Sequence, residues 1–211
     1  DSVSLMLGID SNEILAFPGS TPPPLVDYID AVGNRTFKSW RAQVGWGRDT
    51  RNDFFVPVVG STQSVSAEIA LPGSTVEYYK VSFDFAKYWP LNPALVLRTG
   101  LNFGSGDSYG KDFVRNLCYT APTLPTTGNP NPPPPPAPTD PCLITSPDYD
   151  KTVTATGLPF FENFYAGGIG SVRGYSPCSL DTGATEIYTG GTRQVPVGGQ
   201  TRVVGSAELI F

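Results

Sequence analysis

Histidine is absent from the 211-residue sequence, and only 16% of the residues are charged. The lack of histidine excludes Ser-His-Asp and Cys-His nucleophile systems within this chain, and any metal site that needs an imidazole ligand. No apolar run approaches the roughly 18–20 residues that a membrane-spanning helix requires. The net charge of −5 provides no basic surface for nucleic acid, so we expect no nucleic-acid partner.

Glycine and proline are abundant instead, with 23 and 22 residues. Both residues are unfavourable in helix interiors, so this composition disfavours a helical protein. It is typical of chains in which many short strands are joined by turns and long loops.

Six segments alternate apolar and polar residues with period two, which predicts β-strands. In the first, Val3, Leu5, Leu7 and Ile9 share one face. The polar faces combine small residues with charges of both signs, and aromatic residues lie near several segment ends, as in membrane barrels. We therefore predict an all-β, antiparallel transmembrane β-barrel. A soluble β-sandwich also alternates in this way and remains the alternative. The segments are 2–10, 37–47, 63–71, 78–88, 94–104 and 202–211.

The connections differ greatly in length. Residues 72–77 form a short link, whereas residues 105–200 form one long loop that contains a Pro-rich insertion at 120–140. Five consecutive prolines at 132–136 predict extended polyproline II. Bacterial barrels place long loops outside the cell and short turns in the periplasm, so we expect the long loop to be extracellular.

Six strands are too few to close a barrel, for which the smallest count is about eight. We therefore interpret residues 1–211 as part of one larger barrel domain, and expect about four further strands beyond Phe211.

Within the long loop, residues 158–175 read LPFFENFYAGGIGSVRGY. This run resembles the signature of the BamA-type outer-membrane assembly family, whose sixth extracellular loop folds back into the barrel lumen. Val172, Arg173, Gly174 and Tyr175 match the VRG(F/Y) tip of that loop. Residues 72–81, 100–110 and 206–211 resemble the adjacent strands. The resemblance implies about strands seven to twelve of a sixteen-stranded barrel. The sequence departs from the family in an insertion at roughly 112–156 and in a short stretch after Tyr175.

The tip contains glycines, including Gly167 and Gly168, that permit backbone conformations closed to other residues. The resemblance places Arg173 in the lumen, paired with an acidic residue of the strand after the loop. Alternation puts Glu208 of that strand on the inner face, so we predict a bidentate Arg173–Glu208 contact. In the alternative, Arg173 is a solvated surface charge and Glu208 contacts Arg98 or Arg202.

All three cysteines, Cys118, Cys142 and Cys178, fall in the loop expected to be extracellular, where disulfides form. The count predicts one disulfide and one free thiol. A Cys118–Cys142 bond would close the base of the proline insertion, but Cys178 could replace either partner. Zinc would need a fourth ligand, so we predict no metal, and no cofactor is indicated.

The inner-face carboxylates Glu68, Asp84 and Glu208 have no nucleophile with an activating base beside them, so we predict no enzyme activity. The resemblance implies insertion of β-barrel proteins into the bacterial outer membrane. Implied partners are outer-membrane lipid, unfolded outer-membrane protein substrates and assembly-complex lipoproteins. The gate residues would lie outside this chain.

A secretion pore of the two-partner type shares the VRGY loop and is the first alternative. Five upstream periplasmic repeats would indicate assembly, and two would indicate secretion. A soluble β-sandwich that serves as a binding module is the second alternative.

Overall fold

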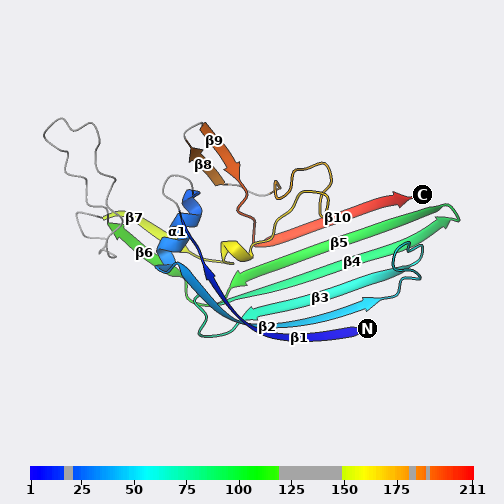
Figure 1. Ribbon diagram of the computed structural model, residues 1–211, viewed down its shortest axis with the longest axis horizontal. Coiled ribbons are helices and arrows are strands. Elements are labelled where there is room, and N and C mark those ends of the chain that lie inside the picture. The colour runs from blue at the N-terminus through cyan, green and yellow to red at the C-terminus, as the bar shows by residue number, and fades with distance from the viewer. Residues whose placement is uncertain (17–20, 119–148, 181–183, 189–190) are drawn as a thin grey trace.

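One curved antiparallel sheet forms most of the molecule (Figure 1). The computed structural model describes residues 1–16, 21–118, 149–180, 184–188 and 191–211. Each strand pairs with the next along the chain, and β5 then pairs with β10 across the long loop. The six predicted strands are thereby confirmed. Their bounds are β1 (Ser2–Glu13), β2 (Thr36–Asp49), β3 (Gly60–Ala70), β4 (Tyr78–Asn92), β5 (Leu95–Ser108) and β10 (Thr201–Ile210).

The two ends of the sheet differ in what they carry. At one end, which we call the turn end, residues 50–59 join β2 to β3 and a tight connection joins β4 to β5. At the other end, the loop end, lie the remaining elements. These are α1 (Pro23–Val32), the hairpin of β6 (Phe113–Cys118) and β7 (Tyr149–Ala155), the 3₁₀ turn η1 (Phe160–Glu162), and the hairpin of β8 (Ala184–Tyr188) and β9 (Gly191–Val195).

Helix α1 lies between β1 and β2 and was not predicted. It begins with proline in its first turn and ends at Gly33, whose left-handed φ of 70° lets its N–H donate to the Ile29 carbonyl. No helix in the described part of the chain is long and apolar enough to cross a membrane.

An apolar cluster packs the elements of the loop end together. The Tyr28 ring of α1 meets Phe160 of η1 edge-on at 5.5 Å between centroids, and Phe37 of β2 meets Phe161 at 5.2 Å. Helix α1, the β6–β7 hairpin and η1 therefore share one core. The β6–β7 hairpin is the base of the insertion predicted at 112–156, so the base of that insertion belongs to the core. The predicted polyproline stretch at 120–140 lies outside the described residues. The buried members are Tyr28, Ala31, Phe37, Val76, Leu117, Val153 and Ala155.

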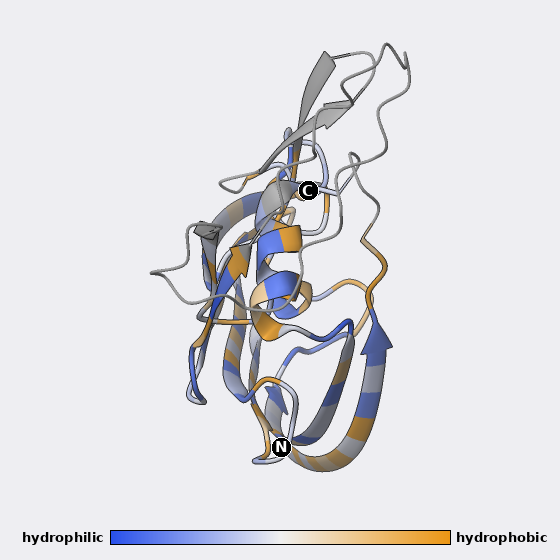
Figure 2. Ribbon diagram, turned by 90° about the vertical axis from the view of Figure 1, so that its left-hand side faces the viewer, coloured by the Kyte–Doolittle hydropathy of each residue, from blue (hydrophilic) through white to orange (hydrophobic). Residues whose placement is uncertain are grey.

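The two faces of the sheet have opposite chemistry, visible as alternating colours along the ribbons in Figure 2. On β10, Arg202, Ser206 and Glu208 are half-buried on the inner face, whereas Val203 and Leu209 are 65% and 58% exposed on the outer face. No second sheet covers the outer face in the described residues. Beside this sheet the described residues contain only two separate two-stranded hairpins, so the β-sandwich alternative is wrong for the fold.

The band of outer apolar residues crosses the strands obliquely. On β1 the last outer apolar residue towards the loop end is Ile9, and the next outer residue is the polar Ser11. On β10 the last one towards the loop end is Val203, and the outer residue beyond it is the polar Thr201. Val203 lies in the same register row as Val3, so the edge of the band shifts by six residues over five strand spacings. This corresponds to about 20 Å along the strands against about 24 Å across them, a tilt of about 40°. Strands of membrane barrels tilt by about 35–45° to the barrel axis. The row is Val3, Trp46, Val65, Phe83, Phe103 and Val203.

Candidate functional site

Residues 158–175, which we call the returning segment, carry the VRGY tip and lie against the inner face of the sheet. The six-stranded sheet is the wall of the partial barrel. The returning segment enters where the Gly157 N–H donates to the Ser108 hydroxyl at 3.2 Å. Further along, Phe164 and Gly199 exchange two backbone hydrogen bonds of 2.9 Å. Gly199 lies just before β10, so these bonds join the middle of the segment to the strand that follows the loop.

Glycines in β5 make room for this segment. Gly104 lies under Phe164, which is only 7% exposed, and a β-carbon at Gly104 would come within 2.4 Å of the ring. The ring is also flanked by two cations, with Lys80 Nζ at 4.8 Å and Arg202 Cζ at 5.5 Å from its centre. Such cation–π contacts stabilise the ring most where water is excluded.

Glu162 connects the segment to two more strands. Lys80 Nζ of β4 donates to the Glu162 carbonyl at 2.8 Å and lies 3.3 Å from its carboxylate. The Arg41 guanidinium of β2 lies 3.6 Å from the same carboxylate. The Glu162 side chain is 17% exposed, which makes it far less accessible to water than Arg173. Sequence reasoning missed Glu162, although its acidic side chain stands inside the matched run.

Arg41, one of the two cations that contact Glu162, also pairs with carboxylates of the sheet. Arg41 contacts Asp10 of β1 and Glu68 of β3, and the Tyr78 hydroxyl donates to Glu68 Oε1 at 3.0 Å. Half-buried charges are tolerated when they are paired and hydrogen-bonded. This network therefore joins β1, β2, β3 and β4 to the returning segment.

The tip turns away from the wall at a pair of glycines. Gly167 and Gly168 have φ values of 109° and 90°, which side-chain-bearing residues rarely adopt. A β-carbon at Gly167 would come within 2.6 Å of the Ser176 carbonyl. The Leu180 N–H donates to the Ala166 carbonyl at 3.1 Å and closes the base of the tip.

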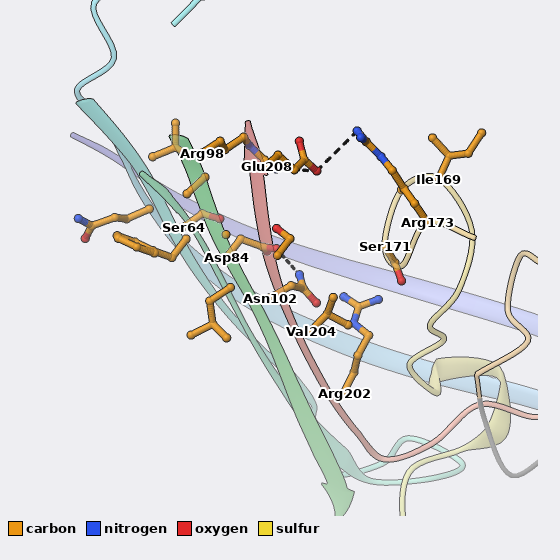
Figure 3. A pocket seen from close by; sticks show the side chains of 18 residues that line it. Ser64, Asp84, Arg98, Asn102, Ile169, Ser171, Arg173, Arg202, Val204 and Glu208 are labelled. Carbon is orange, nitrogen blue, oxygen red and sulfur yellow. Dashed lines mark hydrogen bonds and ion pairs between the residues drawn. The ribbon is translucent and has the colours of Figure 1, made fainter. Parts of the chain in front are cut away.

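Arg173 reaches back from the tip to β10 (Figure 3). Its Nη2 lies 3.6 Å from Glu208 Oε1, and Arg98 Nη1 of β5 lies 3.5 Å from the same oxygen. These distances describe ion pairs; charge-assisted hydrogen bonds are about 2.7–2.9 Å long. The bidentate geometry expected from sequence is thus not the one found. Arg202 points elsewhere and donates to the Tyr165 carbonyl at 3.0 Å.

The space between tip and wall is a polar cavity of about 490 Å³. Its charged lining residues are Asp84, Arg98, Arg173, Arg202 and Glu208. The Arg173 side chain is 70% exposed there, against 29% for Glu208. Within this six-stranded sheet Arg173 is largely uncovered, and its 3.6 Å pair with Glu208 is longer than a charge-assisted hydrogen bond.

Of the cysteines, Cys178 has a free thiol and an unusual φ of 57°. Cys142 lies outside the described residues, so the Cys118–Cys142 pairing remains a prediction. Among the residues that the structure describes, no group of three or more Cys, Asp or Glu side chains is arranged to hold a metal ion.

The family model of the Omp85 superfamily domain matches residues 1–211. The chain belongs to the Omp85 superfamily. The curated relative described as outer membrane protein assembly factor BamA, from Neisseria meningitidis serogroup B, is 28% identical over 197 residues. That match covers 90% of this chain and 19% of the relative. The predicted relationship to the BamA family is thereby confirmed.

A solved structure has the same fold. BamA from Haemophilus ducreyi lacking POTRA domains 1–3 matches 98% of this chain with a TM-score of 0.64 at 21% identity. The match covers 33% of that chain. The chain thus spans about a fifth of the curated relative and a third of the solved one. Its six-stranded sheet is a partial antiparallel barrel of the Omp85 type.

Proposed function

We propose that this chain forms part of an outer-membrane barrel that inserts and folds other β-barrel proteins. The observation that carries the proposal is the returning segment 158–175, which is held on the inner face by Glu162 and Arg173. The curated relative matched over 90% of the chain is described as an assembly factor. No chemical step is part of this function.

In this proposal the returning segment works as an internal strut. Glu162 ties it to Arg41 and Lys80 of β2 and β4, while Arg173 ties it to Glu208 of β10. The segment therefore bridges strands that are four places apart in the sheet. Such a bridge resists changes in wall curvature, so a gate elsewhere in the barrel can open while the five strands from β2 to β10 keep their shape.

The two faces define the surroundings of the strut. The outer apolar band contacts outer-membrane lipid, and the inner face borders a water-filled lumen. The loop end would be extracellular and the turn end periplasmic. The macromolecular partners in this proposal are unfolded outer-membrane proteins and the lipoproteins of an assembly complex.

The test uses the full-length protein in cells depleted of the native copy, with the amount of folded porin in the outer membrane as readout. We expect Arg173→Ala to lower folded porin several-fold. The control is Arg48→Ala, which removes an exposed arginine at the turn end, 3.6 Å from Asp1. Equal porin levels in the two variants would contradict the proposal.

The two-partner secretion pore predicts a different outcome in the same cells. Porin would stay normal, and one exported protein would disappear from the medium. The number of upstream periplasmic repeats in the parent gene separates the two functions independently, since five indicate assembly and two indicate secretion.

A further inference from the structure

We propose that the returning segment is attached at two separable places, one permanent and one reversible. The seat comprises Glu162 and Phe164 with their contacts on β2, β4, β5 and Gly199. The latch is the Arg173–Glu208 ion pair at the tip. The latch opens by rotation at Gly167 and Gly168 while the seat stays in place. This inference rests on the proposed function and assigns to Glu162 the role of positioning the returning segment on the wall. The porin level tests the function and spin-label distances test the two attachments, so either proposal can fail alone.

The seat combines several kinds of contact on poorly accessible groups. Lys80 binds both the carbonyl and the carboxylate of Glu162, at 2.8 and 3.3 Å. Phe164 is 7% exposed, is paired with Gly199 through two backbone bonds, and stands over Gly104. Glu162 and Lys80 are the charged pair of this attachment, so removing either charge should weaken the seat as a whole.

Within this chain the latch makes few contacts. Arg173 is 70% exposed, and its pair with Glu208 measures 3.6 Å. Its neighbours Ile169 and Tyr175 are 88% and 56% exposed. A β-carbon built at Gly174 would meet no heavy atom within 4 Å. Exposed ion pairs of this kind are screened by water and salt and contribute little to stability.

The wall side of the latch remains paired when the tip leaves. Arg98 lies 3.5 Å from the same Glu208 oxygen that Arg173 approaches. Opening therefore moves Arg173 into water without leaving Glu208 alone on the wall. A charge that keeps a partner on opening makes the transition less costly than breaking a solitary buried pair.

The hinge lies between the two attachments. Gly167 and Gly168 have left-handed φ values, and the Leu180–Ala166 hydrogen bond of 3.1 Å fixes the chain on the seat side of them. Glycine passes between backbone regions with little steric cost. Rotation there moves residues 169–176 and leaves residues 158–166 on the wall.

Distances between spin labels on the full-length protein in lipid vesicles test this. In a background with the three cysteines replaced by serine, one pair joins residues 169 and 91, tip to turn end. The other joins residues 196 and 91, from the chain beside the seat to the turn end. Ile169, Pro196 and Leu91 are all exposed. We expect Arg173→Gln to add a second, shifted population to the 169–91 distances and to leave the 196–91 distances unchanged. Glu162→Gln and Lys80→Met are expected to shift both.

The matched control is Asp84→Asn, since Asp84 is an inner-face carboxylate that is hydrogen-bonded to Asn102 of the wall. It should change neither distance. Variants are compared only where the heat-dependent gel mobility typical of a folded barrel is retained, and Lys80→Met serves if Glu162→Gln fails to fold. The proposal is overturned if Arg173→Gln shifts both distances, or if the two seat variants leave the 196–91 distance in place.

Discussion

Phe164 lies directly over Gly104, at a separation that leaves no room for a β-carbon between them. This contact joins the returning segment to the wall at the level of the register row Ser82–Gly104–Arg202. It explains why β5 has glycine at that position. It also makes the position of the segment sensitive to a single methyl group.

Gly104→Ala should displace Phe164 and destabilise the barrel by about 1–3 kcal/mol, the usual cost of overpacking. Urea unfolding of the full barrel in vesicles measures this. Gly205→Ala is the matched control, because Gly205 lies on the adjacent strand with no heavy atom within 4 Å of a built β-carbon. Equal losses in both variants would show that strand propensity, and not the Phe164 contact, sets the cost.

Arg173 and Glu208 should couple only weakly in stability. Their pair is 3.6 Å long and the arginine is 70% exposed, so a double-mutant cycle with Arg173→Gln and Glu208→Gln should give no more than about 1 kcal/mol. Folded-porin levels should nevertheless fall with Arg173→Gln. A coupling of about 3–5 kcal/mol, the range of buried pairs, would mean that the arginine is enclosed in the membrane-embedded protein.

The turn at residues 50–59 should depend on pH through Asp53. Its Oδ1 accepts the N–H groups of Val56 at 3.0 Å and Phe55 at 2.7 Å, and these bonds lower the pKa of the carboxyl group. Because the folded pKa lies below the unfolded value of about 3.9, the stabilisation is complete above that value and is lost as the pH falls through the folded pKa.

Amide hydrogen exchange of Phe55 and Val56, corrected for the intrinsic rate at each pH, measures this effect. Protection should exceed that of Asp53→Asn at pH 6 and approach that of the variant as the pH falls through the folded pKa of Asp53. If wild type and Asp53→Asn showed the same protection at pH 6 as at low pH, Asp53 would not stabilise the turn.

The strands and their faces were readable from sequence because alternation is a local property. Each strand shows it without reference to its neighbours, and parity alone placed Glu208 on the inner face. Helix α1 was missed although its signals were present. Prolines stand at its start, Gly33 ends it, and the spacing of Leu25, Tyr28, Ile29 and Val32 is helical.

The seat could not be predicted in the same way. Glu162 and Lys80 are 82 positions apart, and nothing in the local sequence of either indicates the other. Family resemblance directed attention to the arginine of the tip. The structure shows that the more enclosed contacts are made earlier in the same run, by Glu162 and Phe164.

The central claim is that the outer face of the sheet meets lipid and the inner face meets water. Single cysteines along β10 in the full-length barrel, each carrying a fluorophore, test it with quenchers confined to the bilayer or to water. We predict bilayer quenching at 203, 207 and 209, and aqueous quenching at 204, 206 and 208. Aqueous quenching at all six positions would contradict the account, because it would place this strand outside the membrane.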